Sequence, residues 1–248
     1  MPQRVLDSIR SGFGFLTTIP VGFNEAALDS LATRMWIFTL VGAAIGLLVG
    51  GISSALAFMP HMSDFVHAAL TLVALYALTG FIHLDGLADV GDGLLKHGTM
   101  QERLQVIKDP YIGVGGIAFC VLAFLLLFAA VASIKSTALL PALITAEVAA
   151  KLSMVEVASL GKATHHGLGS RFAEKSGLLT FIVALLLAAL VAVLCFGVRG
   201  LLVLLPPLAL SFGLVKLANM AFGGINGDVI GSSNELGRLI ALVVISFL

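Results

Sequence analysis

The feature that most constrains this chain is a series of apolar runs, each roughly 20 residues long, that recur along its whole length. A helix of that length can cross the hydrocarbon core of a bilayer. Inside lipid the backbone must satisfy its own hydrogen bonds, so a spanning segment is either a helix or part of a closed barrel. The runs are continuous rather than alternating and are rich in Leu, Ala and Val, which favours helices. We therefore expect an all-α, polytopic integral membrane protein.

Composition agrees with that expectation. Only 11% of the residues are charged, whereas soluble domains carry about 25%. The formal net charge is zero, which argues against nucleic acid as a partner. There is no repeat at a fixed period and no long linker, so residues 1–248 are expected to form a single integral domain. About six to seven membrane helices are predicted, at 35–58, 64–83, 113–134, 137–158, 177–197 and 200–219, with a short last one at 236–248 that could begin near Val229.

The distribution of lysine and arginine predicts how the chain is oriented. With the N-terminus in the cytoplasm, only two of the fourteen, Lys135 and Arg199, fall outside, and Arg238 is counted with the cytoplasmic segments. The long polar connections fall on the cytoplasmic side too, so the chemistry is expected at the inner face of the cell membrane. The N-terminal "MPQRVLDSIRSGFGFLTTIP" lacks the apolar core of a signal peptide and reads as an amphipathic segment on the membrane surface.

Three aspartates follow the second span in the stretch "HLDGLADVGDG". If that span continues as a helix, Asp85, Asp89 and Asp92 lie at i, i+4 and i+7 on one stripe. Carboxylates placed like this repel one another unless a cation joins them, and oxygen-only ligands suit magnesium or manganese. The alternative is an acidic turn with solvated charges. Gly86 would let a ligand or a neighbouring helix approach the backbone, and His83 is expected to be packed and hydrogen-bonded rather than a ligand.

A second polar segment, "TMQERLQVIKDPYIGVGGI", precedes the third span. Thr99 and Glu102 resemble a capping box that opens a short helix, which the following proline ends. A lysine, a carboxylate and a glycine-rich turn with free N–H groups at a helix start would together suit phosphate oxygens. These groups are Lys108, Asp109, Gly113 and Gly116.

Two further sets of polar residues lie in the second half of the chain. In "GGINGDVIGSSNELG", Asp228 and Glu235 are seven residues apart on one helical face, although a plain polar loop is the alternative. Glu147 and Lys151 are an i, i+4 pair inside a span. Lys151 either reaches a bound phosphate or forms a purely structural pair. The adjacent histidines of "KATHHGLGSRF" are not expected to bind zinc, because neighbouring residues point apart.

Clustered carboxylates, a cation and glycine turns at one membrane face indicate a magnesium-dependent phosphoryl or nucleotidyl transfer. The expected metal ligands are Asp85, Asp89, Asp92 and Asp228. Any carboxylate left over, Asp109 included, could orient or deprotonate an attacking hydroxyl. The chain has no Walker-type loop, serine elbow or suitably placed cysteine nucleophile, which favours direct transfer to a hydroxyl. The one-sided acidic face argues against the rival interpretation, a cation transporter.

The stretches "GFIHLDGLADVGDGLL", "IKDPYIGVGGI", "HHGLG" and "FGGINGDVIGSSNELG" occur in the order found in the cobalamin synthase family, the adenosylcobinamide-GDP ribazoletransferases, which the chain resembles almost end to end. The resemblance implies that a hydroxyl of α-ribazole, or of its 5′-phosphate, attacks the diphosphate of adenosylcobinamide-GDP with help from magnesium. GMP leaves, and adenosylcobalamin or its phosphate is formed. The resemblance covers His83, Asp85, Gly86, Asp89, Asp92, Asp109, Gly113, Gly116, Gly227, Asp228 and Glu235.

Some features depart from that family or point to a second one. Many relatives carry arginine in place of Lys108 and Lys151, and lysine loses the bidentate phosphate contact. The stretch "DGLADVGD" is also similar, more distantly, to the signature of CDP-alcohol phosphotransferases, so a phospholipid-type phosphotransferase is the alternative enzyme. A kinship of fold with that group is an analogy. Small-residue helices and short external loops are compatible with a homo-oligomer in the bilayer.

Overall fold

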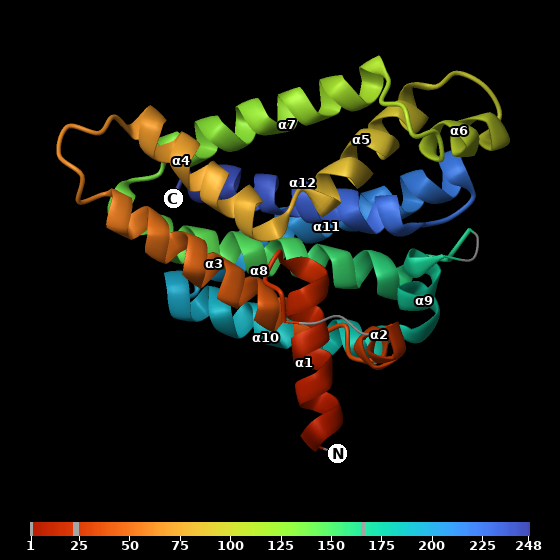
Figure 1. Ribbon diagram of the computed structural model, residues 1–248, viewed down its shortest axis with the longest axis horizontal. Coiled ribbons are helices and arrows are strands. Elements are labelled where there is room, and N and C mark those ends of the chain that lie inside the picture. Colours follow the sequence, from red (N-terminus) through yellow and green to blue (C-terminus); the bar gives the residue numbers. More distant parts are fainter. Residues whose placement is uncertain (1, 22–24, 165–166) are drawn as a thin grey trace.

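The computed structural model describes residues 2–21, 25–164 and 167–248, and these residues form a bundle of helices (Figure 1). Among them the only β contact is an isolated bridge between Ala163 and Ile225. The helices are α1 (Pro2–Leu16), α2 (Glu25–Ala32), α3 (Ile37–Leu56), α4 (Asp64–Thr79), α5 (Ile82–Leu95), α6 (Met100–Ile107), α7 (Val114–Ser133), α8 (Ser136–Leu160), α9 (Leu168–Lys175), α10 (Leu178–Phe196), α11 (Arg199–Phe222) and α12 (Gly227–Ile245).

The chain is an all-α, multi-pass membrane protein, as the sequence predicts. Within the described residues, five helices are long and apolar enough to cross a bilayer: α3, α7, α8, α10 and α11. The bent pair α4 and α5 makes a sixth span if it is counted as one. Helix α12 begins at Gly227 rather than at 236, which gives it 19 residues. The longer start matters because it places the polar C-terminal motif inside the helix.

Helix α8 lies at the centre of the bundle, and most of its residues are buried. Helices α3, α10, α11 and α12 pack around it (Figure 1). Glycine allows the closest of these contacts: a Cβ at Gly46 of α3 would lie 2.4 Å from the Cα of Ile144. A central helix with few lipid contacts can carry polar side chains, because neighbouring helices can supply their partners.

The second span is broken, contrary to the expectation that it continues straight into the aspartate motif. Gly80 and Phe81 both adopt left-handed backbone conformations, with φ of 73° and 59°. The chain therefore turns by 96° between α4 and α5. Left-handed geometry is costly for a phenylalanine, and the Phe81 ring stacks on Tyr76 at 5.0 Å between centroids. As a result α5 leaves the middle of the bundle obliquely and runs to the end where α6 lies (Figure 1).

The two ends of the bundle differ in what they carry (Figure 1). One end holds α6, α9 and the turn from α11 to α12, and therefore most of the polar connections. The other end holds the connection from α3 to α4, the short turns before α8 and α11, and the end of α12. The long polar segments of the sequence thus gather at one end of the molecule, as expected.

Candidate active site

The acidic cluster is built from helices α5 and α12. Asp85, Asp89 and Asp92 lie on α5, which forms a helix over this motif as predicted. Asp85 is exposed, and Asp89 and Asp92 are partly buried. Asp228, near the start of α12, acts electrostatically on Asp89, as do the other two aspartates of α5. The structure therefore brings the first and last acidic motifs of the sequence together, more than 130 residues apart along the chain.

A glycine makes this meeting of α5 and α12 possible. A Cβ at Gly86 would lie 2.7 Å from the carbonyl oxygen of Asp228 and 3.0 Å from its Cα. Any larger residue would push the two backbones apart, because contacts this short are repulsive. Of the two partners predicted for Gly86, a ligand or a neighbouring helix, the structure shows the neighbouring helix.

Asp92 differs from the other aspartates because both of its oxygens are engaged. Its Oδ2 accepts a hydrogen bond of 2.6 Å from the backbone N–H of Gly113, and its Oδ1 accepts one of 2.8 Å from Gly116. These N–H groups lie at the start of α7, where no carbonyl group of the helix itself can accept a hydrogen bond from them. They had been expected to meet phosphate, but in this structure they donate to Asp92. The carboxylate thereby fixes α7 against α5.

The segment between α5 and α7 contains the predicted capping box. The hydroxyl of Thr99 accepts from the backbone N–H of Glu102 at 3.3 Å, and Glu102 accepts from the backbone N–H of Thr99 at 2.7 Å. That backbone hydrogen bond from Thr99 holds the pKa of Glu102 below its ordinary value of 4.5. Lys108 and Asp109 are exposed at the end of α6, and Asp109 accepts from the backbone N–H of Tyr111 at 3.0 Å.

The start of α12 is held by side-chain and backbone contacts. Asn226 caps the helix by accepting from the N–H of Val229 at 2.9 Å, and its amide donates to Asp228 at 2.8 Å. Gly227 is exposed, and beside it a Cβ at Gly169 would lie 2.3 Å from the Gly227 nitrogen. The segment containing "KATHHGLG" thus packs against the polar C-terminal motif. His165 and His166 lie outside the described residues.

A second polar cluster lies buried between α4, α8 and α12, and we call it the buried ion network. Glu147 pairs with Lys151 at 3.1 Å and with both Nε and Nη2 of Arg238. Glu235 accepts from Arg238 at 2.6 Å, and Lys151 donates to Asn234 at 2.7 Å. The network further includes Tyr76, whose hydroxyl donates to Glu235 at 2.8 Å.

This network changes the interpretation of three charged residues. Arg238 is fully buried in α12, so counting it with the cytoplasmic segments was wrong. Lys151 and Glu235 are predicted from the sequence to bind substrate, but in the structure both bind other side chains of the protein. For Lys151 this is the second of the two predicted roles, a purely structural ion pair. Tyr76 and Arg238 were not singled out from the sequence. An arginine three residues after Glu235 was the available signal, because the two face the same side of a helix.

His83 is packed rather than exposed, as expected. It is 5% exposed and faces α12, where a Cβ at Gly231 would lie 3.5 Å from the His83 Cα. Its Nε2 is buried without a hydrogen-bond partner, so the expected hydrogen bond is not made at that atom. The side chain lies close to the buried ion network, because Lys151, Arg238 and Glu147 all act on it electrostatically.

The donor chemistry of the acidic cluster fits a magnesium ion. No group of three or more His, Cys, Asp or Glu side chains within the described part of the chain is arranged to hold a metal by itself. Magnesium, however, is commonly bound by one or two carboxylates together with substrate phosphates and water. Asp85, Asp89 and Asp228 offer hard oxygen donors whose mutual repulsion a cation would relieve.

Comparisons with known proteins agree along almost the whole chain. Residues 8–246 match a family described as cobalamin-5-phosphate synthase. An adenosylcobinamide-GDP ribazoletransferase of Methanococcoides burtonii is 36% identical over 96% of this chain and 91% of its own length. The protein of the same name from Methanosarcina mazei is 37% identical over the same shares, and that of Caldanaerobacter subterraneus is 30% identical over 94% of this chain and 95% of its own. No solved structure matches the chain significantly.

Proposed function

The chain belongs to the cobalamin-5-phosphate synthase family, and from this we propose that it joins adenosylcobinamide-GDP to α-ribazole, or to α-ribazole 5′-phosphate, and releases GMP. It is a membrane-embedded transferase of small-molecule substrates. A ribose hydroxyl oxygen forms a bond to the phosphorus on the cobinamide side of the diphosphate. The phosphorus–oxygen bond to GMP breaks, and the hydroxyl proton is lost. The product is adenosylcobalamin or its 5′-phosphate.

The observation that carries the assignment of the site is the meeting of α5 and α12 at Gly86. It gathers Asp85, Asp89 and Asp228 from two distant motifs at one place in the bundle. A diphosphate carries several negative charges, so bare carboxylates would repel it. We therefore assign these three aspartates to hold magnesium. Magnesium held by Asp85, Asp89 and Asp228 would supply stabilisation of the negative charge that develops on the leaving phosphate.

The other predicted site residues differ in where they lie, and we propose a different role for each position. Asp92 holds α7 in place through two backbone N–H groups, so its contribution is to position the start of that helix. Lys108 and Asp109 are exposed on the connection that follows α6, where they can meet the phosphates or the acceptor. An aspartate that is not occupied by the metal would take the proton of the attacking hydroxyl.

We place this site on the cytoplasmic side of the cell membrane. The segments around α6 and α9 carry six lysines and arginines, whereas the turns at the other end carry only Lys135 and Arg199, and this is the arrangement favoured for cytoplasmic loops. Large exposed hydrophobic side chains cover the outer faces of α7, α10 and α11 and support contact with the bilayer. Association into a homo-oligomer stays a prediction.

The decisive experiment gives the purified, vesicle-reconstituted protein two substrate pairs. With adenosylcobinamide-GDP, α-ribazole and magnesium we expect stoichiometric GMP and a new corrinoid by liquid chromatography. With a CDP-lipid and an alcohol we expect no CMP. Removal of divalent ions by EDTA should stop the reaction, and added magnesium should restore it.

Three results would contradict separate parts of these proposals. Turnover of the CDP-lipid pair instead of the corrinoid pair would show the alternative phosphotransferase, which the comparisons do not favour. Undiminished GMP release in EDTA would remove the magnesium assignment but leave the transferase activity standing. Ion flux without any GMP would indicate a transporter.

A further inference from the structure

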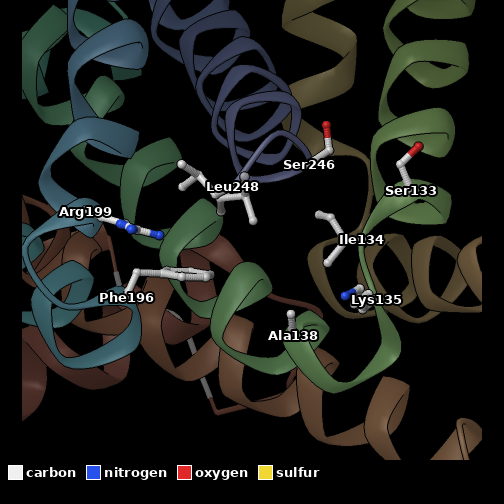
Figure 2. A pocket seen from close by; sticks show the side chains of 9 residues that line it. Ser133, Ile134, Lys135, Ala138, Phe196, Arg199, Ser246 and Leu248 are labelled. Atoms are coloured by element: carbon white, nitrogen blue, oxygen red, sulfur yellow. The ribbon is translucent and has the colours of Figure 1, made fainter.

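A cavity of about 400 Å³ lies at the end of the bundle opposite the acidic cluster. It is formed where α7 and α10 end, where α8 and α11 begin, and where α12 finishes. Figure 2 shows Arg199 and Phe196 on one side of the hollow and Ile134 and Lys135 on the other. None of the residues that line it belongs to the acidic cluster or to the buried ion network.

The two charged side chains that line this cavity, Lys135 and Arg199, are both cations, and Leu248, the last residue of the sequence, lines it too. Lys135 and Arg199 are the two cations that the orientation of the chain leaves at this end, and both line the one cavity. Within the described residues neither forms an ion pair with a carboxylate. The two cations stand on opposite sides of the hollow (Figure 2), so an anion between them would be attracted to both.

The backbone adds to the same field. Lys135 directly precedes α8, and Arg199 is the first residue of α11. Neither helix start has a side-chain cap or an acidic residue in its first turn. The N-terminal ends of helices carry partial positive charge and unsatisfied N–H groups, which favour anions and disfavour cations. Two such starts next to two cations favour an anion at this place.

The remaining wall is apolar. Ile134 and Ile245 are buried at 8% and 5% exposure, and Phe196 and Ala138 are partly buried. The hydroxyls of Ser133 and Ser246 also line the cavity. Since α7, α8, α10 and α11 all have ends here and are candidate membrane spans, the cavity lies level with the interface of the bilayer. An anionic group joined to an apolar chain matches both halves of the lining.

We propose that this cavity binds an anionic phospholipid of the outer leaflet, with its phosphate between Lys135 and Arg199 and an acyl or isoprenoid chain against Phe196 and Ile134. The lipid links the ends of α7 and α10 to the starts of α8 and α11. The site is separate from the transfer reaction and does not depend on it.

The test is native mass spectrometry of the full chain in detergent, titrated with phosphatidylglycerol and, separately, with phosphatidylcholine. We expect tighter binding of phosphatidylglycerol to the wild-type protein. The double variant Lys135→Gln/Arg199→Gln should weaken that binding roughly thirtyfold, which is about fivefold for each of the two charges. The matched control, Lys96→Gln/Lys162→Gln, removes two exposed cations at the other end and should leave the binding unchanged.

A second variant separates the cavity from surface charge. Ala138→Trp keeps both cations but fills the apolar wall, so it should also lose phosphatidylglycerol, and it keeps the proposal testable if the double variant does not fold. The proposal is overturned if the wild-type protein binds both lipids equally, if either variant binds like the wild type, or if inorganic phosphate displaces the lipid at equal concentration. The last result would show a site for a free anion.

Discussion

Four aspartates of the candidate active site share one side-chain chemistry but have different surroundings. Asp92 accepts two backbone N–H groups at the start of α7. Asp85 is exposed, and Asp89 lies in the repulsive field of three other carboxylates, with that of Asp228 foremost. At the scale of single residues these surroundings distinguish the positioning role proposed for Asp92 from the metal-binding role proposed for the other three.

Asp89→Asn tests the metal-binding role. The substitution removes one ligand and one negative charge, so GMP release should fall by about two to four orders of magnitude at fixed magnesium. Because the mutual repulsion of the carboxylates is reduced, the unfolding temperature should stay the same or rise. GMP release and thermal unfolding of the same preparation measure both effects. Wild-type turnover in this variant would exclude Asp89 as a ligand.

Asp92→Ala tests the positioning role. It leaves the N–H groups of Gly113 and Gly116 without an acceptor, which should reduce the free energy of unfolding by about 2 kcal/mol. Asp92→Asn keeps one acceptor oxygen and should lose about half as much. The control is Asp85→Ala on the same helix, which should leave the thermal unfolding unchanged. Equal destabilisation by Asp85→Ala would show that the measured loss is not due to the start of α7.

At the scale of secondary-structure elements, the contact between α5 and α12 determines the site. The two helices meet backbone to backbone where a Cβ at Gly86 would lie 2.7 Å from the Asp228 carbonyl oxygen. Asp85 and Asp89 lie near Gly86 on α5, and Asp228 lies at the contact on α12. Their spacing therefore depends on how closely two backbones approach.

Gly86→Ala tests that dependence without changing any acidic side chain. The added methyl forces α5 and α12 apart, and a displacement of about 1 Å can cost about 100-fold in rate. The control is Gly213→Ala in α11, where a Cβ meets nothing within 4 Å. That variant should keep full GMP release and gain up to about 1 kcal/mol from helix propensity. Similar activities of the two variants would show that the close approach is not needed.

Helix α6 provides a pH-dependent prediction. The pKa of Glu102 is lowered by the backbone N–H of Thr99, so its stabilisation of α6 is fully present above the ordinary value of 4.5 and is lost as the pH falls through the lowered pKa. Hydrogen-exchange protection of the first turn of α6, corrected for intrinsic rates, should decrease below pH 4.5. Glu102→Gln should remove this pH dependence. Persistence of the dependence in that variant would assign it to another group.

At the scale of the whole molecule, the buried ion network joins α4, α8 and α12 in the middle of the bundle. Its four charged members are two acids and two bases, Glu147, Glu235, Lys151 and Arg238, so their charges cancel. Buried charges are tolerated when they are paired, but removing one partner leaves another uncompensated. The network therefore fixes how α12 is placed along α8, and with it the position of Asp228.

Arg238→Ala should reduce the free energy of unfolding by about 3–5 kcal/mol, because Glu147 and Glu235 lose their shared partner. Glu147→Gln/Arg238→Gln should cost less than the sum of the two single changes, since the partners are removed together. Lys175→Ala breaks an exposed pair with Asp29, of 2.7 Å, and should have no measurable effect. Thermal unfolding in detergent compares all of these. Additive losses for Glu147 and Arg238 would contradict a coupled network.

The sequence by itself determined the features that depend on neighbouring residues. Apolar runs of spanning length produced the membrane helices, the threonine–glutamate spacing produced the capping box of α6, and the i, i+4 order produced the pair of Glu147 and Lys151. The acidic cluster was also predictable in part, because the first motif carries three aspartates at helical spacing and the last motif, with Asp228, was predicted to fall on the same side of the membrane. Local periodicity and charge distribution encode all of these.

Only the tertiary structure decided how those parts meet. It places the left-handed turn at Phe81 and buries Arg238 against Glu147, 91 residues away. It also brings the carboxylate of Asp92 into hydrogen bonds with the start of α7. None of these follows from spacing along the chain, because each depends on which distant backbone or charge arrives at the same place. Burial removes water as a partner, so each polar group must bind whatever the packed helices bring to it.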